Sequence, residues 1–237
     1  MAANTRPSLQ ALDSTSTINV PERVAKSKFN GEVIIGDTEY DGRAILYILK
    51  ADQTNYINYI KPLILAEELQ LPHLLSVIDA RDEWFYRIHP ERMVPALKDH
   101  DPETNQQVVV FEGTACLQYL AERYDVDGTW RGRNLAEKGA ILAWTVYQTA
   151  GLGMHSNTLK HWDILEKRVG ESGQDYIALG DRPTLTDLSY FPFAMPWMFT
   201  FLGVDIKDWP HIQKWSKRML SRPPVSKVLG KAPTLGH

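Results

Sequence analysis

Two short segments carry residue types that are unusual for their surroundings. In HPERMVPALKDHD (89–101), Pro95 lies inside an apolar run that otherwise resembles a buried strand. Proline has no backbone N–H to donate to a sheet, so an edge strand is the plain structural explanation of this position. In the second segment, FEG (111–113) precedes a predicted helix. The unpaired N–H groups and positive dipole end at the start of a helix suit a carboxylate.

A third segment, ADQTNYINYIKP (51–62), is rich in residues that favour turns and helix caps. It leads into IKPLILAEELQL (60–71), an apolar stretch with helical spacing. Because Pro62 is tolerated only near the first turn of a helix, we expect this helix to begin near Asn58. Asparagine is also a favourable N-cap residue at such a position.

Several other kinds of chemistry lack the residues that they need. Cys116 is the single cysteine, so an intramolecular disulfide and a CxxC dithiol are excluded, and we expect Cys116 to be a small buried residue. The stretch GTWRGR (128–133) lacks the Lys and Ser/Thr of a phosphate-binding loop. No metal site is predicted, because metal-like spacing with carboxylates is missing around His73, His89, His100, His155, His161, His211 and His237.

The composition is that of a soluble globular protein: the 237 residues are 43% hydrophobic and 23% charged. The net charge of −3 argues against a general nucleic-acid binder, and no apolar run is long enough to cross a bilayer. Residues 1–28 are polar, lack the apolar core of a signal peptide, and are predicted to form a disordered tail. Together with the single cysteine, these features favour a cytoplasmic protein.

The first half of the chain has the pattern of a small α/β unit. EVIIGDTEY (32–40) is predicted to be a hairpin or an edge segment, and AILYILK (44–50) is typical of a strand buried on both faces. The helix after Asn58 connects this strand to HLLSVIDA (73–80), and the resulting βαβ unit implies a parallel pair of strands.

A short helix and an antiparallel hairpin are predicted next. The hairpin consists of MVPALKD (93–99) and QQVVVFEG (106–113), and the helix TACLQYLAERYD (114–125) follows it. The order βαβ-αββα therefore spans residues 29–125.

The remainder, residues 133–230, has a helical pattern, so we place a domain boundary at about residues 125–133. Three apolar stripes with helical spacing support this interpretation: Leu135, Leu142, Val146 and Ala150; Leu188, Phe191, Met195, Met198 and Leu202; and Ile212, Trp215 and Met219.

Two motifs, in this order along the chain, resemble those of glutathione transferases. VPALKDHD…VVVFEGTACLQYLAERYD is similar to the family's Val-Pro-Ala-Leu strand, Glu-Ser turn and helix ending in Tyr-Leu-x-x-x-Tyr. LGDRPTLTDLSYFPF (179–193) is similar to a capping box of the second domain, with Thr184 and Asp187 as the reciprocal pair. The resemblance covers residues 44–230. It implies a thioredoxin-like N-terminal domain, a C-terminal helical-bundle domain and a homodimer.

The resemblance also implies where glutathione binds. In this fold the Val94–Pro95 bond is cis, which turns the backbone N–H and C=O of Val94 outward to pair with the cysteinyl part of glutathione. Glu112 is expected to hold the γ-glutamyl ammonium, and the backbone N–H groups of Gly113 and Thr114 are available to its carboxylate. Gly113 stands where the family has serine, so the serine hydroxyl bond is lost unless Thr114 supplies one.

A second departure from the family lies at Met93. Many members have Lys or Gln there to hold the glycine carboxylate of glutathione. Arg92, one residue earlier, is a candidate replacement, and a solvated arginine is the alternative.

Glutathione transferases stabilise the glutathione thiolate with a donor at the first strand–helix junction. One donor and a helix N-terminus lower the pKa of a thiol from its usual value of about 8.5. The candidates in this sequence, in order, are Asn58, Tyr56, and Asn55 or Thr54. Asn58 falls on the asparagine of a Pro-Asn-Gly turn in fungal prion-like and related bacterial members, although Ile57 and Tyr59 replace its neighbours. A plain helix N-cap is the alternative role of Asn58, and the two roles are compatible.

The electrophile pocket of the family is built from the junction loop and the first helix of the second domain. The matching segment here, LAWTVYQTAGLGMHSNTLKHW (142–162), offers Trp144, Tyr147, Gln148 and His155. Ordinary core packing is the alternative explanation for most of its aromatic residues. His155 and Tyr147 are candidates for orienting the substrate or protonating a leaving group.

The stretch EGTACLQYLAERYDVDGTW (112–130) most resembles fungal transferases that add glutathione to oxidised diketopiperazine intermediates of epipolythiodioxopiperazines such as gliotoxin. Glutathione would then be a co-substrate, with no further cofactor, and an acyl-imine-like carbon would be the electrophile. Two alternatives stay open. One is a detoxifying transferase or a glutathione-dependent peroxidase or disulfide reductase, which a narrow pocket would favour over a wide pocket lined by Trp144 and Tyr147. The other is a non-catalytic binding protein on the same scaffold.

Overall fold

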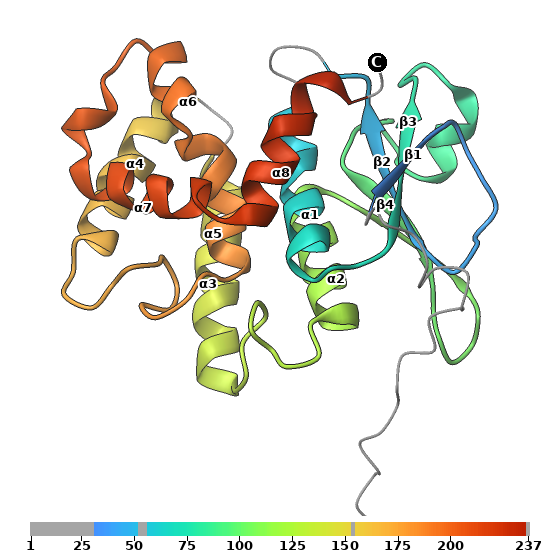
Figure 1. Ribbon diagram of the computed structural model, residues 1–237, viewed down its shortest axis with the longest axis horizontal. Helices are drawn as coiled ribbons and strands as arrows, with labels where there is room; N and C mark the ends of the chain where they lie inside the picture. The colour runs from blue at the N-terminus through green and yellow to red at the C-terminus, as the bar shows by residue number, and fades with distance from the viewer. Residues whose placement is uncertain (1–30, 52–55, 153–154, 236–237) are drawn as a thin grey trace, which may run out of the picture.

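The structure of the protein is a computed structural model that describes residues 31–51, 56–152 and 155–235. The predicted tail, residues 1–28, lies outside the described residues. A sheet with flanking helices forms one side of the molecule and a group of helices forms the other (Figure 1).

The described residues form a five-stranded sheet with the order β1-β3-β2-β4-β5. Strands β1 (Gly31–Ile35) and β2 (Ala44–Leu49) both run parallel to β3 (His73–Ile78). Strand β4 (Ala96–His100) is antiparallel to β2, and β5 (Gln107–Phe111) is antiparallel to β4. The predicted parallel pair and the predicted hairpin are both confirmed. The segment 32–40 contributes an edge strand and not a hairpin, because β1 pairs with β3.

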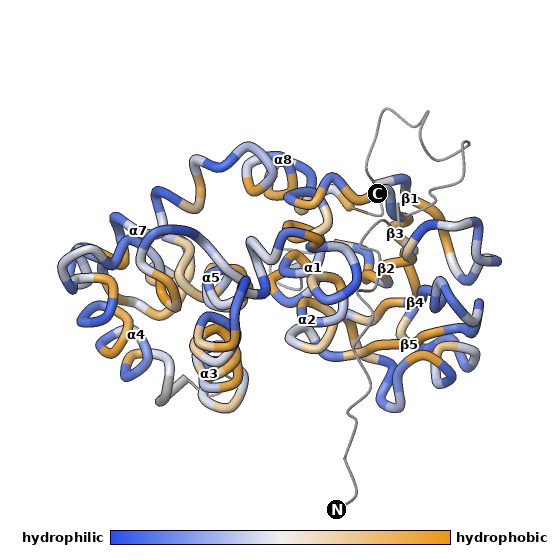
Figure 2. Tube along the Cα trace, turned by 90° about the horizontal axis from the view of Figure 1, so that it is seen from below, coloured by the Kyte–Doolittle hydropathy of each residue, from blue (hydrophilic) through white to orange (hydrophobic). Residues whose placement is uncertain are grey.

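Helices α1 (Tyr56–Glu68) and α2 (Gly113–Tyr124) cover one face of the sheet. Successive side chains of β2 point to opposite faces, so Leu46 packs in the core that includes α1 and α2, whereas Tyr47 packs against Phe85. Phe85 belongs to the short helical turn η1 (Glu83–Arg87), where a short helix is predicted. The strands β2 and β5 are mainly apolar along their length (Figure 2).

Helix α1 differs from the prediction at its start. It includes residues from Tyr56 onward, two residues before Asn58, so Pro62 lies in the helix interior. Because Pro62 has no N–H, the carbonyl of Asn58 lacks the donor that residue i+4 of a helix normally supplies.

The second half of the chain is helical, as predicted. Its helices and short helical turns are α3 (Leu135–Gly151), α4 (His155–Val169), α5 (Leu185–Tyr190), η2 (Phe191–Ala194), α6 (Pro196–Phe201), η3 (Ile206–Asp208), α7 (Pro210–Leu220), α8 (Pro223–Lys231) and η4 (Ala232–Thr234). The capping box of Thr184 and Asp187 is confirmed at the start of α5. The boundary predicted at residues 125–133 falls in the segment between α2 and α3.

The apolar stripe predicted on α3 faces outward and does not pack in the core. Leu135, Leu142 and Val146 are 87%, 54% and 51% exposed. The buried face of α3 instead includes Thr145, whose hydroxyl donates to the Ile141 carbonyl and lies 3.1 Å from the hydroxyl of Thr186 on α5. Helix α3 therefore packs on α5 through small polar side chains, which apolar periodicity alone does not predict.

The sheet half and the helical half share one apolar core, which extends from β2 to α7 and α8. Helix α8 lies beside α1, where Arg222 forms two hydrogen bonds of 2.6 and 2.8 Å with Glu68. Lys227 forms a further ion pair with Glu67 at 2.5 Å. In the described part of the chain, no helix has both the length and the apolar character needed to cross a membrane.

Candidate functional site

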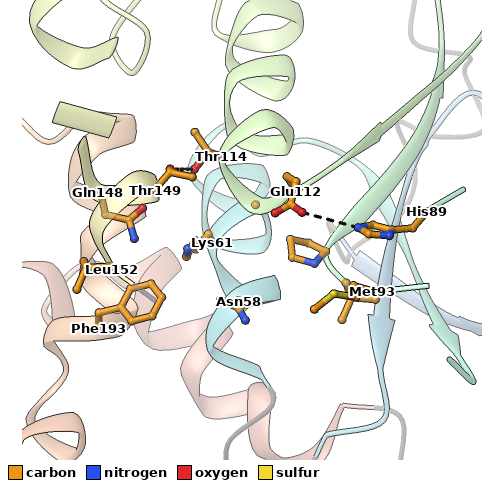
Figure 3. A pocket seen from close by; sticks show the side chains of 13 residues that line it. Asn58, Lys61, His89, Met93, Glu112, Thr114, Gln148, Thr149, Leu152 and Phe193 are labelled. Carbon is orange, nitrogen blue, oxygen red and sulfur yellow. Dashed lines mark hydrogen bonds and ion pairs between the residues drawn. The ribbon is translucent and has the colours of Figure 1, made fainter. Parts of the chain in front are cut away.

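A cavity of about 170 Å³ lies where the sheet half meets the helical half. The loop before β4, the starts of α1 and α2, the end of α3 and the turn η2 all contribute to its wall. Figure 3 shows these side chains converging from both halves. Six of the predicted glutathione-binding or catalytic residues line it: Asn58, Val94, Pro95, Glu112, Gly113 and Thr114.

The loop before β4 brings backbone groups to the cavity. The Val94–Pro95 peptide bond is cis, as the resemblance implies. Strand β4 begins only at Ala96, so Val94 is outside the ladder between β4 and its neighbours. Its N–H and C=O groups are therefore not committed to those strands.

Glu112 is the N-cap residue of α2 and has a positive φ of 74°. A non-glycine residue in this region is uncommon and is strained, and such strain is often found at functional sites. The carboxylate is exposed and lies 3.9 Å from Nε2 of the buried His89. The backbone N–H of Glu91 donates to Nδ1 of His89 at 3.0 Å, so a neutral His89 carries its proton on Nε2, facing Glu112.

Helix α2 begins at Gly113, so the backbone N–H groups of its first turn have no acceptors within the helix. A Cβ atom at Gly113 would lie 3.6 Å from Cδ of Lys61 and 3.6 Å from Cγ of Pro95. Oγ1 of Thr114 is 2.5 Å from Oγ1 of Thr149 on α3, so this hydroxyl is already bonded to the helical half. This end of the cavity thus offers N–H groups and little free side-chain hydroxyl.

Helix α1 contributes Asn58 and Lys61, one turn apart. Asn58 is exposed, and its carbonyl oxygen lies 3.8 Å from the position of a Cβ at Gly113. Lys61 is 6% exposed, and Nζ lies 4.7 Å from the ring centre of Phe193. Burial lowers the pKa of the Lys61 ammonium from 10.5 to about 8, against an opposing effect of the Glu112 charge.

The helical half closes the cavity with Gln148, Thr149 and Leu152 of α3 and with Phe193 of η2. Gln148 is buried, and its Oε1 accepts a hydrogen bond from the hydroxyl of Ser189 on α5. Of the residues predicted for the electrophile pocket, Gln148 therefore lies at the cavity.

The remaining predicted site residues have other surroundings. Trp144 contacts Arg168, at 5.7 Å from its guanidinium carbon, and Tyr147 stacks on His161 with ring centres 4.7 Å apart. Arg92 lies over the ring of Tyr86 and donates to the Arg81 carbonyl at 3.0 Å. Their proposed contacts with ligands stay predictions.

The other candidate residues, including those at the junction between β2 and α1, have different surroundings. The ring of Tyr56 lies 6.2 Å from that of Trp197, and burial raises the pKa of its hydroxyl. Thr54, Asn55 and the side chain of His155 lie outside the described residues. Cys116 is buried, as predicted, and burial raises the pKa of its thiol to about 12, so it is a poor nucleophile.

Sequence reasoning missed the site positions of Lys61, His89, Thr149 and Phe193. Lys61 had one visible signal, because it is the single charge in the otherwise apolar stretch YIKPLILA (59–66). The other three come from segments far apart in the sequence, and only the packing of the two halves brings them together.

Comparisons with known proteins agree with the fold and identify the family. Models of the glutathione S-transferase N-terminal and C-terminal domains match residues 59–123 and 140–218. The chain is 69% identical over 220 residues to glutathione S-transferase aclG of Aspergillus oryzae, which covers 84% of this chain and 100% of that protein. It is 66% identical over 207 residues, 86% of this chain, to the trimodular acetylaranotin synthesis protein ataIMG of Aspergillus terreus, of which the match spans 24%.

Among solved structures, the crystal structure of a glutathione transferase homolog from Lodderomyces elongisporus, with two GSH per subunit, has the same fold. The TM-score is 0.69 at 21% identity, over 81% of this chain and 99% of that chain. The chain therefore belongs to the glutathione S-transferase family, with a thioredoxin-like N-terminal domain and a helical C-terminal domain.

Proposed function

We propose that the protein forms a C–S bond between glutathione and an oxidised diketopiperazine in fungal secondary metabolism. The observation that carries this proposal is the cavity itself. It combines a cis-proline loop, the start of a helix and a carboxylate with a wall from the helical domain. The similarity to aclG and to an acetylaranotin synthesis protein supports the class of electrophile.

The cysteinyl and γ-glutamyl parts of glutathione each have a partner in this arrangement. The backbone of Val94 pairs with the cysteinyl residue, as one strand pairs with another. Glu112 faces the γ-glutamyl ammonium, and the first N–H groups of α2 face the γ-glutamyl carboxylate. The thiol then lies toward Asn58 at the start of α1, with the electrophile between it and α3.

The reaction is an addition that needs no oxidant. The thiolate sulfur attacks the carbon of an acyl-imine C=N bond, the C–S bond forms, and the π electrons move to nitrogen. Nitrogen takes a proton, so the net change is the addition of one glutathione across the C=N bond. Asn58 stabilises the thiolate, and the cavity holds the two reactants in contact.

The test of glutathione binding is calorimetric titration of the wild type and of Glu112→Gln. The substitution keeps the shape of the side chain at its positive φ and removes its charge. We expect Glu112→Gln to bind glutathione about 10- to 100-fold more weakly than the wild type does, because the charged partner of the ammonium is lost. A wild type that binds no glutathione contradicts the proposed function.

The role of Asn58 is tested by the thiolate absorbance of bound glutathione as a function of pH. Removal of the donor in Asn58→Ala is expected to raise the thiol pKa by about one unit and to lower turnover at neutral pH. An unchanged thiol pKa shows that Asn58 is not the thiolate donor, and the same titration of Tyr56→Phe then tests the second candidate.

A glutathione-dependent disulfide reductase or peroxidase is the second candidate function. The positions of Trp144 and Tyr147 away from the cavity favour this function over one with a bulky substrate. Turnover of 2-hydroxyethyl disulfide, compared with addition of glutathione to a chemically generated diketopiperazine acyl-imine, separates the two. The faster reaction identifies the function.

We also propose a homodimer in the cytoplasm, where glutathione is kept reduced. The outward apolar stripe of Leu135, Leu142 and Val146 supports a partner surface on α3. Phe111 and Met93 are exposed apolar side chains of the sheet domain. They suit the contact that the family makes between the first domain of one subunit and the second domain of the other.

A further inference from the structure

Lys61 is a buried cation in the cavity wall, and the steps proposed above leave it without a role. It lies on α1 and borders the cavity together with Gly113 and Phe193. Figure 3 shows its nitrogen turned into the cavity, between Gln148 and Glu112.

Within the described residues, Lys61 has no ion-pair partner. Its ammonium contacts the ring of Phe193, whose centre is 4.7 Å from Nζ. Glu112 affects Lys61 only through a longer-range electrostatic interaction. Moving a charge out of water costs free energy unless an opposite charge lies against it. This arrangement is typical of a binding site in which the ligand supplies the anion that pairs with the buried cation.

The start of α2 forms the other half of this anion site. Its first N–H groups are unpaired within the helix, and Gly113 and Thr114 line the same cavity as Lys61. Gly113 has no side chain to separate these N–H groups from Lys61. The two residues are close, because a Cβ at Gly113 would lie 3.6 Å from Cδ of Lys61. The Thr114 hydroxyl is bonded to Thr149. Lys61 is therefore the side chain best placed to hold an anion at this point.

We propose that Lys61 binds the α-carboxylate of the γ-glutamyl residue of glutathione, in place of a side-chain hydroxyl at the start of α2. This inference rests on the glutathione binding proposed above. The carboxylate then has an ion pair with Lys61 and N–H donors from α2, while the ammonium on the same carbon faces Glu112. Two opposite charges on the protein thus match the two charges of one amino-acid end group, which makes the site selective for an intact γ-glutamyl residue.

The test compares glutathione with γ-aminobutyryl-cysteinyl-glycine, which lacks only that α-carboxylate, by calorimetric titration at pH 7. We expect the wild type to prefer glutathione by about 10- to 100-fold, the range of a charge-assisted contact. Lys61→Met keeps a side chain of similar length without the charge. It is expected to lose most of this preference, with an unchanged affinity for the analogue. Lys61→Arg is expected to keep most of the preference.

Two further variants make the test specific. Lys214→Met removes an exposed lysine of α7 and is expected to bind both ligands as the wild type does. Gly113→Ser in the Lys61→Met background supplies a hydroxyl beside the same carboxylate. A Cβ at Gly113 meets only ordinary contact distances, so this double variant is expected to recover part of the affinity for glutathione.

The outcomes separate this inference from the function on which it rests. If Lys61→Met binds glutathione like the wild type, or loses affinity equally for both ligands, Lys61 does not recognise the carboxylate. If the wild type itself binds no glutathione, the proposed function fails and the role of Lys61 fails with it.

Discussion

Lys61 shows how a binding residue acts on the stability of the free protein. Burial lowers the pKa of its ammonium from 10.5 to about 8, so the unfolded chain binds this proton more tightly than the folded chain does. A difference of 2.5 units corresponds to about 3 kcal/mol of destabilisation while the group is charged in both states. The cost is fully present below pH 8 and disappears as the pH rises toward 10.5.

Lys61→Met is therefore expected to make the free protein more stable at pH 7 while weakening the binding of glutathione. We expect the free energy of unfolding to rise by about 1–3 kcal/mol at pH 7, since solvent relaxation reduces the full electrostatic cost. The gain is expected to shrink between pH 8 and pH 10. Urea denaturation followed by tryptophan fluorescence at several pH values measures both effects.

Lys61→Arg is the matched control for this prediction. Arginine stays charged throughout this pH range, so its stability relative to Lys61→Met should not change with pH. A Lys61→Met protein that is less stable than the wild type at pH 7 would show that packing of the lysine stem outweighs the cost of its charge.

Most residues of the site could be located from the sequence because they lie in one motif that resembles glutathione transferases. Val94 and Pro95 occupy its first segment and Glu112 with Gly113 its second, and all four line the cavity. Lys61 could not be assigned in the same way, because a lysine in an apolar helix has no defined direction until the neighbouring elements are placed. The contacts of Trp144 with Arg168 depend on how α3 packs against α4, which a helical period does not determine.

At the scale of elements, the capping box of α5 holds the helical domain together around one buried carboxylate. Oδ1 of Asp187 accepts from the backbone N–H of Ile177 at 3.0 Å and from Nε1 of Trp215 at 2.9 Å. Oδ2 accepts from the backbone N–H of Thr184 at 2.8 Å. Asp187 thus joins α5, α7 and the segment before α5, and burial raises its pKa.

Asp187→Ala is expected to lower the free energy of unfolding by about 3 kcal/mol or more, because four buried donors of Ile177, Thr184 and Trp215 lose their acceptor. Thr184→Ala removes only the hydroxyl of the cap and is expected to cost about 1 kcal/mol. Asp181→Ala, at an exposed ion pair with Arg182, is the control and should change stability by less than about 1 kcal/mol. Urea titration of the three variants measures the order of these losses of stability. Equal effects of Asp187→Ala and Asp181→Ala would contradict the prediction.

The helices and strands were largely predictable from local sequence patterns. Which strands pair with one another was less predictable. The apolar run of β2 and the two apolar runs of the hairpin are short and bounded by polar turn segments, and all three are strands in the structure. The pairing of β1 with β3 is a contact between segments about 40 residues apart, which alternation along the chain does not encode. The capping box at Thr184 could be predicted because both of its partners lie within four residues.

At the scale of the whole molecule, helix α3 presents apolar side chains on both of its sides. Its inner side belongs to the shared core through Ile141, and its outer side carries Leu135, Leu142 and Val146. Sequence periodicity correctly found this stripe as evidence for a helix, but periodicity reports only that a face is apolar and not what covers it. An apolar stripe that no described element covers is consistent with a second copy of the chain.

Leu142→Glu is expected to shift the protein from dimer to monomer, since a carboxylate on this stripe would lose its hydration in a subunit contact. The variant should raise the dissociation constant of the dimer at least about 10-fold, measured by analytical ultracentrifugation at several concentrations. Phe201→Glu, on an exposed apolar position of α6 in the same domain, is the matched control and should leave the dimer intact. If both variants stay dimeric with native circular dichroism, the interface lies elsewhere. If the wild type is itself a monomer, the outer stripe of α3 is not a dimer contact, and the cavity must bind glutathione within a single chain.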